Sequence, residues 1–185
     1  AAQKDISGDF KDGRSNTIQN KVNANDFNFK IGKDFDEDTS LVFTYESYQS
    51  DYLRPKNGGL HETKISEGEK DQKRLSILST NRISEKAVNQ ISLYQNKNYL
   101  NDNYNDPMNV WLMELETSGI SDQVTYTTEN HTLVGGFDFY QDKIKNYSST
   151  SYGYTDAWRD RTITNRAFYL QDAWHMNNEW TLTTG

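Results

Sequence analysis

The residues best suited to recognising another molecule gather in one segment, 142–162, which we predict to be a long loop. Aromatic side chains offer rigid contact area there, and two arginines can each hold an anionic group through paired hydrogen bonds. A second predicted loop, over 50–72, carries further candidates. A surface loop without a ligand is the alternative for both segments. The candidate ligand-binding residues are Tyr147, Tyr152, Tyr154, Trp158, Arg159 and Arg161 in the first loop, and Tyr52, Arg54 and His61 in the second.

No group of residues in the sequence points to catalysis. The three histidines, His61, His131 and His175, are far apart in the sequence, and the absence of cysteine excludes thiol nucleophiles, thiolate metal sites and disulfides. The acidic run 34–38 lacks the glycine and the terminal glutamate of an EF-hand loop, so a solvated turn explains it better. We therefore expect no enzymatic activity, no catalytic residue, no metal site and no cofactor.

The composition favours a folded chain with an unusually polar surface. Of the 185 residues, 25% are charged and only 34% are hydrophobic, yet 13% are aromatic, which a disordered chain would lack. The mean hydropathy is -0.96, and the longest apolar run, 110–113, is too short for a membrane-spanning helix. The net charge of -7 disfavours nucleic acid as a partner, because nucleic-acid binding requires a basic surface.

Apolar and polar residues alternate with period two in many segments, for instance over 27–31 and 41–46. This alternation is typical of half-buried β-strands, and we find no helical periodicity over ten or more residues. We therefore predict an all-β, antiparallel chain of about nine strands. The expected strands are 3–11, 23–34, 39–50, 73–83, 87–98, 109–128, 131–142, 162–175 and 179–185.

The breaks between these strands are of two kinds. Short polar turns are centred near 37, 85, 130 and 177, about 46 residues apart, and long breaks over 50–72, 98–109 and 142–162 alternate with them. Short turns therefore fall at one end of the sheet and long loops at the other. An up-and-down transmembrane β-barrel has this asymmetry. A soluble meander or β-sandwich is the alternative, although sandwich strands usually turn every 8–12 residues.

Alternation also assigns residues to the two faces of the predicted barrel wall. The phase slips between 113–115 and 120–124, which we interpret as a β-bulge near Ser118 and Gly119. An odd strand count and a chain that stops within a strand predict a fragment of a larger barrel, because open edges are unfavourable in lipid. Expected lipid-facing residues are Phe27, Phe29, Ile31, Leu41, Phe43, Tyr45, Phe137 and Phe139, and expected lumen-facing residues are Asn28, Lys30, Thr44, Glu46 and Asp138.

Several segments resemble TonB-dependent outer-membrane receptors. The run FYLQDAWHMNNEWTLTTG, residues 168–185, is similar to that family's strand ending YxQDxW, short turn and strand LTLxxG. TLVGGFDFY at 132–140 resembles the preceding TLTxGxDY strand, and GDFKDGR at 8–14 resembles a DYKDGRGN segment. YESYQSDYLRP at 45–55 looks like a strand that enters an extracellular loop. These motifs occur in the family's order along nearly the whole chain.

The resemblance implies that residues 1–185 are the middle part of a transmembrane barrel of 22 strands, whose plug domain and ends lie outside this chain. It implies a receptor of the cell outer membrane that binds and imports an iron chelate. A ferric siderophore is the ligand that we expect first, and haem and cobalamin are the other expected ligands. The implied partners are the chelate, the TonB protein through the plug, and outer-membrane lipid, but no nucleic acid. A porin-like passive barrel and a soluble β-rich carbohydrate-binding module are the alternatives.

Overall fold

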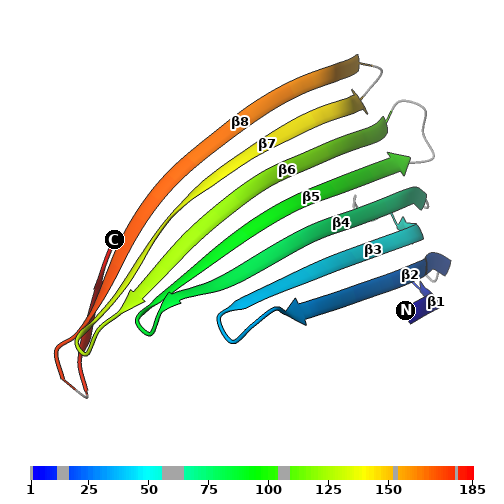
Figure 1. The fold of residues 1–185 in the computed structure, drawn as a ribbon. Coiled ribbons are helices and arrows are strands. Elements are labelled where there is room, and N and C mark those ends of the chain that lie inside the picture. Colours follow the sequence, from blue (N-terminus) through cyan, green and yellow to red (C-terminus); the bar gives the residue numbers. More distant parts are fainter. Residues whose placement is uncertain (1, 12–16, 56–64, 104–108, 152–153, 178) are drawn as a thin grey trace.

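A computed structural model describes residues 2–11, 17–55, 65–103, 109–151, 154–177 and 179–185. The described chain consists of β-strands that run back and forth in one curved sheet (Figure 1). The strands are β1 (Ala2–Lys11), β2 (Thr17–Asp34), β3 (Thr39–Pro55), β4 (Ile65–Ser84), β5 (Ala87–Asn103), β6 (Asn109–Thr127), β7 (His131–Ser151), β8 (Tyr154–His175) and β9 (Thr181–Thr184).

Each described strand pairs antiparallel with the next one along the chain, so the sheet order is β1 to β9 without a crossover. This order confirms the predicted all-β, antiparallel, up-and-down topology and the predicted nine strands. The sheet does not close into a barrel, because β1 and β9 lie at its two opposite edges (Figure 1). No helix within the described ranges has the length and apolar character needed to cross a membrane.

The short turns form where one side chain binds the backbone of a tight bend. Asp36 Oδ1 accepts hydrogen bonds from the backbone N–H groups of Asp38, at 2.9 Å, and Thr39, at 2.6 Å. Asn177 Oδ1 accepts two such bonds of 2.9 Å in the turn before β9. Asp and Asn stabilise turns in this way because their short side chains reach the backbone two or three residues on. The turns predicted near 37 and 177 are confirmed.

The strands run further than the alternation predicted, so the predicted bounds of the long loops are wrong. β3 continues to Pro55 and β5 to Asn103, while β7 and β8 fill most of the predicted loop over 142–162. The ladder between β7 and β8 extends as far as the pair Ser151 and Tyr154. The prediction failed there because residues 148–151 at the end of β7 are serine and threonine on both faces, so backbone pairing continues without any hydrophobic alternation to reveal it.

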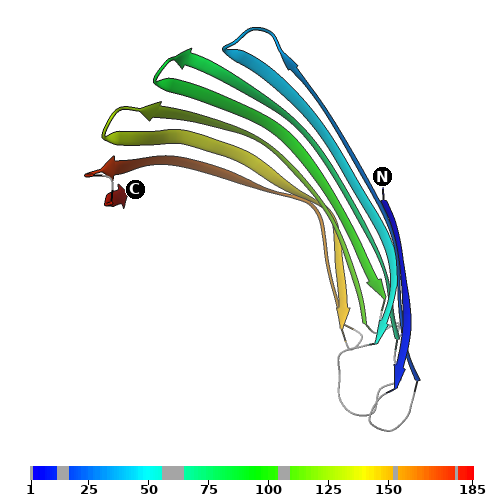
Figure 2. The ribbon, with the colours of Figure 1, turned by 90° about the horizontal axis from the view of Figure 1, so that it is seen from below.

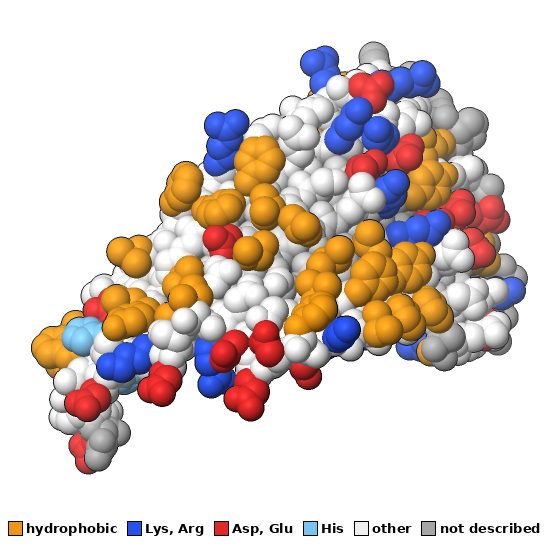
Figure 3. All heavy atoms as spheres, in the orientation of Figure 1, with side chains coloured by type: hydrophobic (Ala, Val, Ile, Leu, Met, Phe, Trp, Pro, Cys, Tyr) orange, Lys and Arg blue, Asp and Glu red, His pale blue; other side chains and the backbone are white. Residues whose placement is uncertain are grey.

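The curvature gives the sheet a convex and a concave face (Figures 1 and 2). Directly opposed residues of neighbouring strands share a face, so the register can be followed from β2 to β8. All eight residues expected to face lipid fall on one face, which is the convex one seen in Figure 3, and the five expected lumen residues fall on the concave one. The predicted division into two faces is confirmed.

The β-bulge predicted at Ser118 and Gly119 is wrong, because both residues pair regularly with β5 and β7. The ladder between β6 and β7 instead skips one residue, Lys145, nearer to the long connections. The change of phase in β6 has another cause. Its apolar side chains lie on the convex face at Ile120, Val124 and Tyr126, but on the concave face at Trp111, Met113 and Leu115.

Candidate functional site

An apolar band crosses the convex face from β2 to β8 (Figure 3). Aromatic rings meet across strands within it, with centroid distances of 6.3 Å for both Phe29–Phe43 and Phe137–Phe168. Phe168 is 85% exposed, so the band has no cover from the described residues. The apolar band comprises Phe27, Phe29, Ile31, Leu41, Phe43, Tyr45, Leu75, Ile77, Ile91, Leu93, Ile120, Val124, Tyr126, Leu133, Phe137, Phe139, Phe168, Leu170 and Trp174.

The apolar band runs obliquely to the cross-strand rows of the sheet. The row that starts at Phe29, the middle of the band on β2, ends at the polar residue Thr164 on β8. On β8, which is six strands away from β2, the band is centred near Leu170. Leu170 lies six residues further along the strand than Thr164. With ~3.4 Å per residue and ~4.8 Å between strands, this shift means that the strands are tilted by ~35° from the normal of the band. Strands of transmembrane barrels are tilted by about 35–45°.

Both margins of the apolar band carry residues that suit a boundary with water. Towards the long connections, Lys73 lies opposite Lys97 on the convex face. Towards the short turns, His131 stacks on Trp174, with ring centroids 6.0 Å apart and planes inclined by 4°. Trp180 in the following turn is 65% exposed. Tryptophan is enriched where a membrane meets water, because its ring is apolar and its N–H is polar.

His131 also has a carboxylate neighbour that the sequence did not reveal. Its Nδ1 lies 3.0 Å from Asp172 Oδ2, although the two residues are 41 positions apart. The contact ties β7 to β8 beside a short turn. Across the described ranges, no three potential metal ligands from His, Cys, Asp and Glu come together.

On the concave face, an aromatic patch covers β6–β8 near the long connections. Tyr147 and Trp158 lie directly opposite each other, with ring centroids 5.3 Å apart. Arg161 is exposed on the same face, opposite Ile144. Flat rings beside a guanidinium group can hold a ligand that has an apolar body and an anionic group. The aromatic patch comprises Trp111, Met113, Leu115, Ile144, Tyr147 and Trp158.

The structure thus brings together three sequence-predicted binding residues, Tyr147, Trp158 and Arg161, but on paired strands rather than in a loop. Arg159 is on a strand as well and lies opposite Asn146 on the convex face, so it is turned away from the aromatic patch. The apolar members of the patch on β6 were not among the predicted binding residues. The change of phase along β6 was the signal for them, and it was misinterpreted as a bulge.

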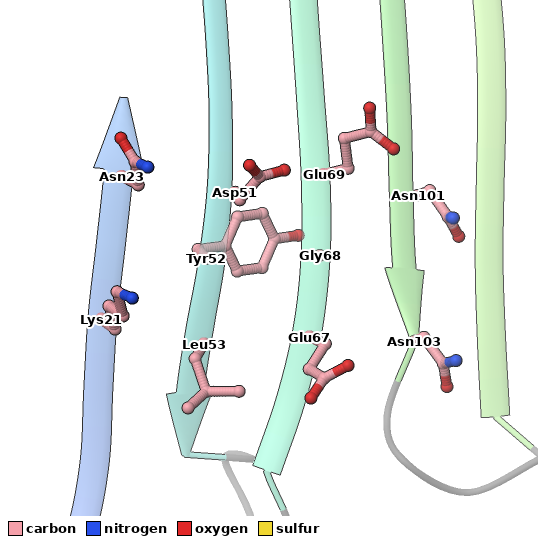
Figure 4. A pocket seen from close by; sticks show the side chains of 10 residues that line it. All are labelled: Lys21, Asn23, Asp51, Tyr52, Leu53, Glu67, Gly68, Glu69, Asn101 and Asn103. Carbon is pink, nitrogen blue, oxygen red and sulfur yellow. The ribbon is translucent and has the colours of Figure 1, made fainter. Parts of the chain in front are cut away.

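Tyr52 lies in β3 and packs over Gly68, the residue opposite it on β4. It lines a hollow of about 520 Å³ near the long connections, together with Lys21, Asp51 and other polar residues of β2–β5 (Figure 4). This hollow does not include the aromatic patch, which belongs to β6–β8. Among the remaining candidates, Arg54 lies in β3, Tyr154 is the first residue of β8, and His61 and Tyr152 fall outside the described residues.

A second hollow, of about 470 Å³, lies on the concave face of β2–β5. Within it, Asn28 Nδ2 donates a hydrogen bond of 3.0 Å to Glu46, and Gln72 Nε2 donates one of 3.0 Å to Asn98. Alternation identified Asn28 and Glu46 as lumen-facing but missed the hollow, which depends on the register of four strands. We call it the polar hollow; its side chains form two adjacent cross-strand rows, Asn28, Glu46, Arg74 and Asn96, and Asp26, Tyr48, Gln72 and Asn98.

Comparisons with protein-family models, with curated proteins and with solved structures find no match for this chain.

Proposed function

We propose that this chain is part of the wall of a transmembrane β-barrel in the outer membrane, of the TonB-dependent receptor type. The oblique apolar band is the observation that carries this proposal. A convex band of exposed aromatic and aliphatic side chains is unfavourable in water and favourable against lipid. The polar concave face then lines a water-filled lumen, and the ~35° obliquity supplies the strand tilt that barrel closure requires.

The unpaired side of β8 in the described sheet supports a larger barrel. Along β8 the residues from Tyr154 to Gln171 have no partner strand on the side away from β7 within the described chain, because β9 pairs only from Asp172 onward. Unpaired backbone groups are costly in lipid, so further strands must cover this edge. In the proposed receptor those strands belong to the rest of a 22-stranded barrel, and a plug domain connects it to the TonB protein.

The aromatic patch supports a binding role in place of passive diffusion. Porin lumens are polar, whereas Tyr147 and Trp158 present rings to the concave side, beside Arg161. We propose that this patch contacts an anionic iron chelate on its way through the barrel, a ferric siderophore first, with haem or cobalamin as the alternative ligands. The protein binds and imports and performs no catalysis. A soluble carbohydrate-binding module is disfavoured, because it would expose the apolar band to water.

An antiserum against this segment, used on fractionated cells grown with and without iron, tests the proposal. We expect a heat-modifiable outer-membrane band that becomes stronger on iron starvation. Uptake of a ⁵⁵Fe-labelled siderophore by cells should fall at least tenfold for the double variant Y147A/W158A. The matched control is F35A at a short turn, which removes an exposed ring outside the lumen and should leave uptake unchanged. A soluble band would overturn the proposal.

A further inference from the structure

We infer that Asp160 is a positioning residue for the aromatic patch. It is an extra residue of β8 and matches the extra residue Lys145 of β7, so that Tyr147 and Trp158 lie opposite each other on the concave side. Asp160 directs these rings through the backbone and does not contact the ligand. Its importance for uptake rests on the proposed function of the patch, whereas its effect on the position of Trp158 does not.

β7 contains one residue more than regular alternation allows. Ile144 and Tyr147 are three residues apart, yet both lie on the concave face, because they pair with concave residues of β6. In a regular strand, residues three apart point to opposite faces. The ladder with β6 skips Lys145, which is therefore the extra residue. If Lys145 took a regular place in the ladder, Tyr147 would point to the convex face.

β8 repeats this irregularity at the same level. Trp158 and Arg161 are also three residues apart, and both lie on the concave face, opposite concave residues of β7. The ladder between β7 and β8 skips Asp160 together with Lys145, and its register is the same on both sides of the skipped pair. The two extra residues thus match each other. As a result, the ring of Trp158 and the guanidinium group of Arg161 are presented on one face.

The backbone of Asp160 has a conformation that interrupts a strand. Its φ of 51° lies in the left-handed region, and no other non-glycine residue in the described ranges has a positive φ. Left-handed residues occur in one class of β-bulge, and among non-glycine residues Asp and Asn are the ones that tolerate this conformation. Asp160 is therefore the point at which alternation along β8 is broken.

The charge of Asp160 matters less than this conformation. Its Oδ1 lies 3.7 Å from Lys143 Nζ, and the two side chains are 73% and 42% exposed. Ion pairs between exposed side chains contribute little to stability. Lys143 belongs to the convex face, where it lies opposite Glu116. The side chain of Asp160 is thus directed away from the aromatic patch, and a substitution there does not remove a group that faces the ligand.

The left-handed conformation at position 160 determines the face of Trp158. If residue 160 were extended like the rest of the strand, β8 would alternate regularly from Arg161 towards Trp158. Arg161 would stay on the concave face, Arg159 would join it there, and Trp158 would turn to the convex face. The aromatic patch would then lose a ring and gain a second guanidinium group.

Cross-linking reports the face of Trp158. Met113 lies on the concave face two strands away, in the same cross-strand row as Trp158. With ~4.8 Å between strands, the two residues are ~10 Å apart. In the full-length protein in detergent, a rigid bismaleimide of that length should link M113C/W158C at least fivefold better than M113C/R159C, because Arg159 is on the convex face.

Substitutions at position 160 should separate conformation from charge. We expect the native preference in D160N and in D160G, since Asn and Gly both accept a left-handed backbone. D160V should reverse the preference, because a β-branched residue disfavours that conformation. The matched control is T162V, which places valine at a regular convex position of β8 and should leave the preference unchanged.

A deletion provides the second variant if D160V does not fold. Removing Lys145 and Asp160 together leaves regular alternation on both strands, with the face and the partner of every other residue unchanged. The preference for M113C/W158C should therefore persist in the deletion variant. Loss of the preference there, or its persistence in D160V, would overturn the inference.

Uptake of a ⁵⁵Fe-labelled catecholate siderophore, an anionic chelate, measures the consequence for binding. D160V should raise the concentration for half-maximal uptake at least fivefold, whereas D160N and D160G should stay within twofold of the native protein. If Y147A/W158A lowers uptake and D160V does not, the positioning role is refuted. If Y147A/W158A leaves uptake unchanged, the proposed function fails, while the cross-linking still decides what positions Trp158.

Discussion

The ring of Tyr169 on β8 lies over Gly136 on β7, and its hydroxyl group reaches Gln123 Oε1 on β6, at 3.2 Å. These three residues form one cross-strand row on the concave face. Tyr94 covers Gly119 in the same way between β5 and β6. A glycine leaves a groove in the strand, and the ring fills that groove. Side chains converge on the concave side of a curved sheet. The glycines leave room there for the large rings of the neighbouring strands.

Gly136→Ala should be strongly destabilising. A Cβ atom there would lie 2.6 Å from the Tyr169 hydroxyl oxygen, and backbone of β6 is close on the other side. We expect a loss of about 1–3 kcal/mol in the free energy of unfolding, as for other overpacked sites. Urea titration followed by tryptophan fluorescence in lipid vesicles measures it.

Gly135→Ala is the matched control, because the nearest atom to its Cβ would be Leu170 Cδ1, at an ordinary 3.4 Å. We expect a change within about 0.5 kcal/mol, as for a substitution that meets no close contact. Equal effects at the two neighbouring glycines would show that the ring of Tyr169 does not settle over Gly136.

The hydroxyl group of Tyr169 should contribute less than its ring. Tyr169→Phe removes only the hydrogen bond to Gln123, so we expect a loss of about 0.5–1.5 kcal/mol in the same titration. Tyr169→Ala also uncovers Gly136 and should cost at least twice as much. If both variants were equally stable, the ring would contribute nothing to the packing of β7 against β8.

A carboxylate inside the apolar band provides a test that distinguishes lipid from water. Asp122 lies on the convex face between Ile91 and Phe137, and Asn89 Nδ2 donates a hydrogen bond to it. In lipid, Asn89→Leu should reduce folding into vesicles by about 1–3 kcal/mol, because the carboxyl group loses its partner. Adding Asp122→Leu should restore folding.

This double-variant series is measured by the fraction of heat-modifiable protein in membranes. In a soluble protein the second leucine would enlarge an exposed apolar surface and cause aggregation. Rescue by the double variant therefore supports the barrel wall, and further loss argues for water on the convex face.

The turn before β3 should depend on one carboxyl group. Asp36→Ala removes two hydrogen bonds to the backbone, of 2.9 and 2.6 Å, and should cost about 1–2 kcal/mol in the free energy of unfolding. Asp36→Asn keeps an acceptor oxygen at the same position and should recover most of that loss. Equal loss in both variants would mean that the charge, and not the geometry of the turn, matters.

Much of the fold could be predicted from the sequence, because alternation marks a strand wherever one face is apolar and the other polar. Phe27 to Ile31 and the short turn at Asp36 were placed correctly for this reason. The extension of β7 to Ser151 could not be predicted, since its last residues are polar on both faces.

The candidate site was only partly predictable. Tyr147, Trp158 and Arg161 could be chosen by residue type, but their common face depends on the skipped residue Lys145, which alternation does not reveal. The partner side chains from β6 and the two rows of the polar hollow come from the register of several strands. Register is set by cross-strand pairing, which a single sequence shows only in outline.

Single-cysteine labelling tests the central claim, that the convex band faces lipid and the concave face lines water. Residues 1–185 contain no cysteine, so Phe43→Cys, Thr44→Cys, Ile77→Cys and Ser76→Cys each introduce one labelling site within this segment, to be compared with the same protein without the substitution. In native outer membranes, spin labels at 43 and 77 should be relaxed by oxygen dissolved in lipid, and labels at 44 and 76 by a water-soluble nickel chelate. Equal access of the nickel chelate to all four positions would contradict the transmembrane wall.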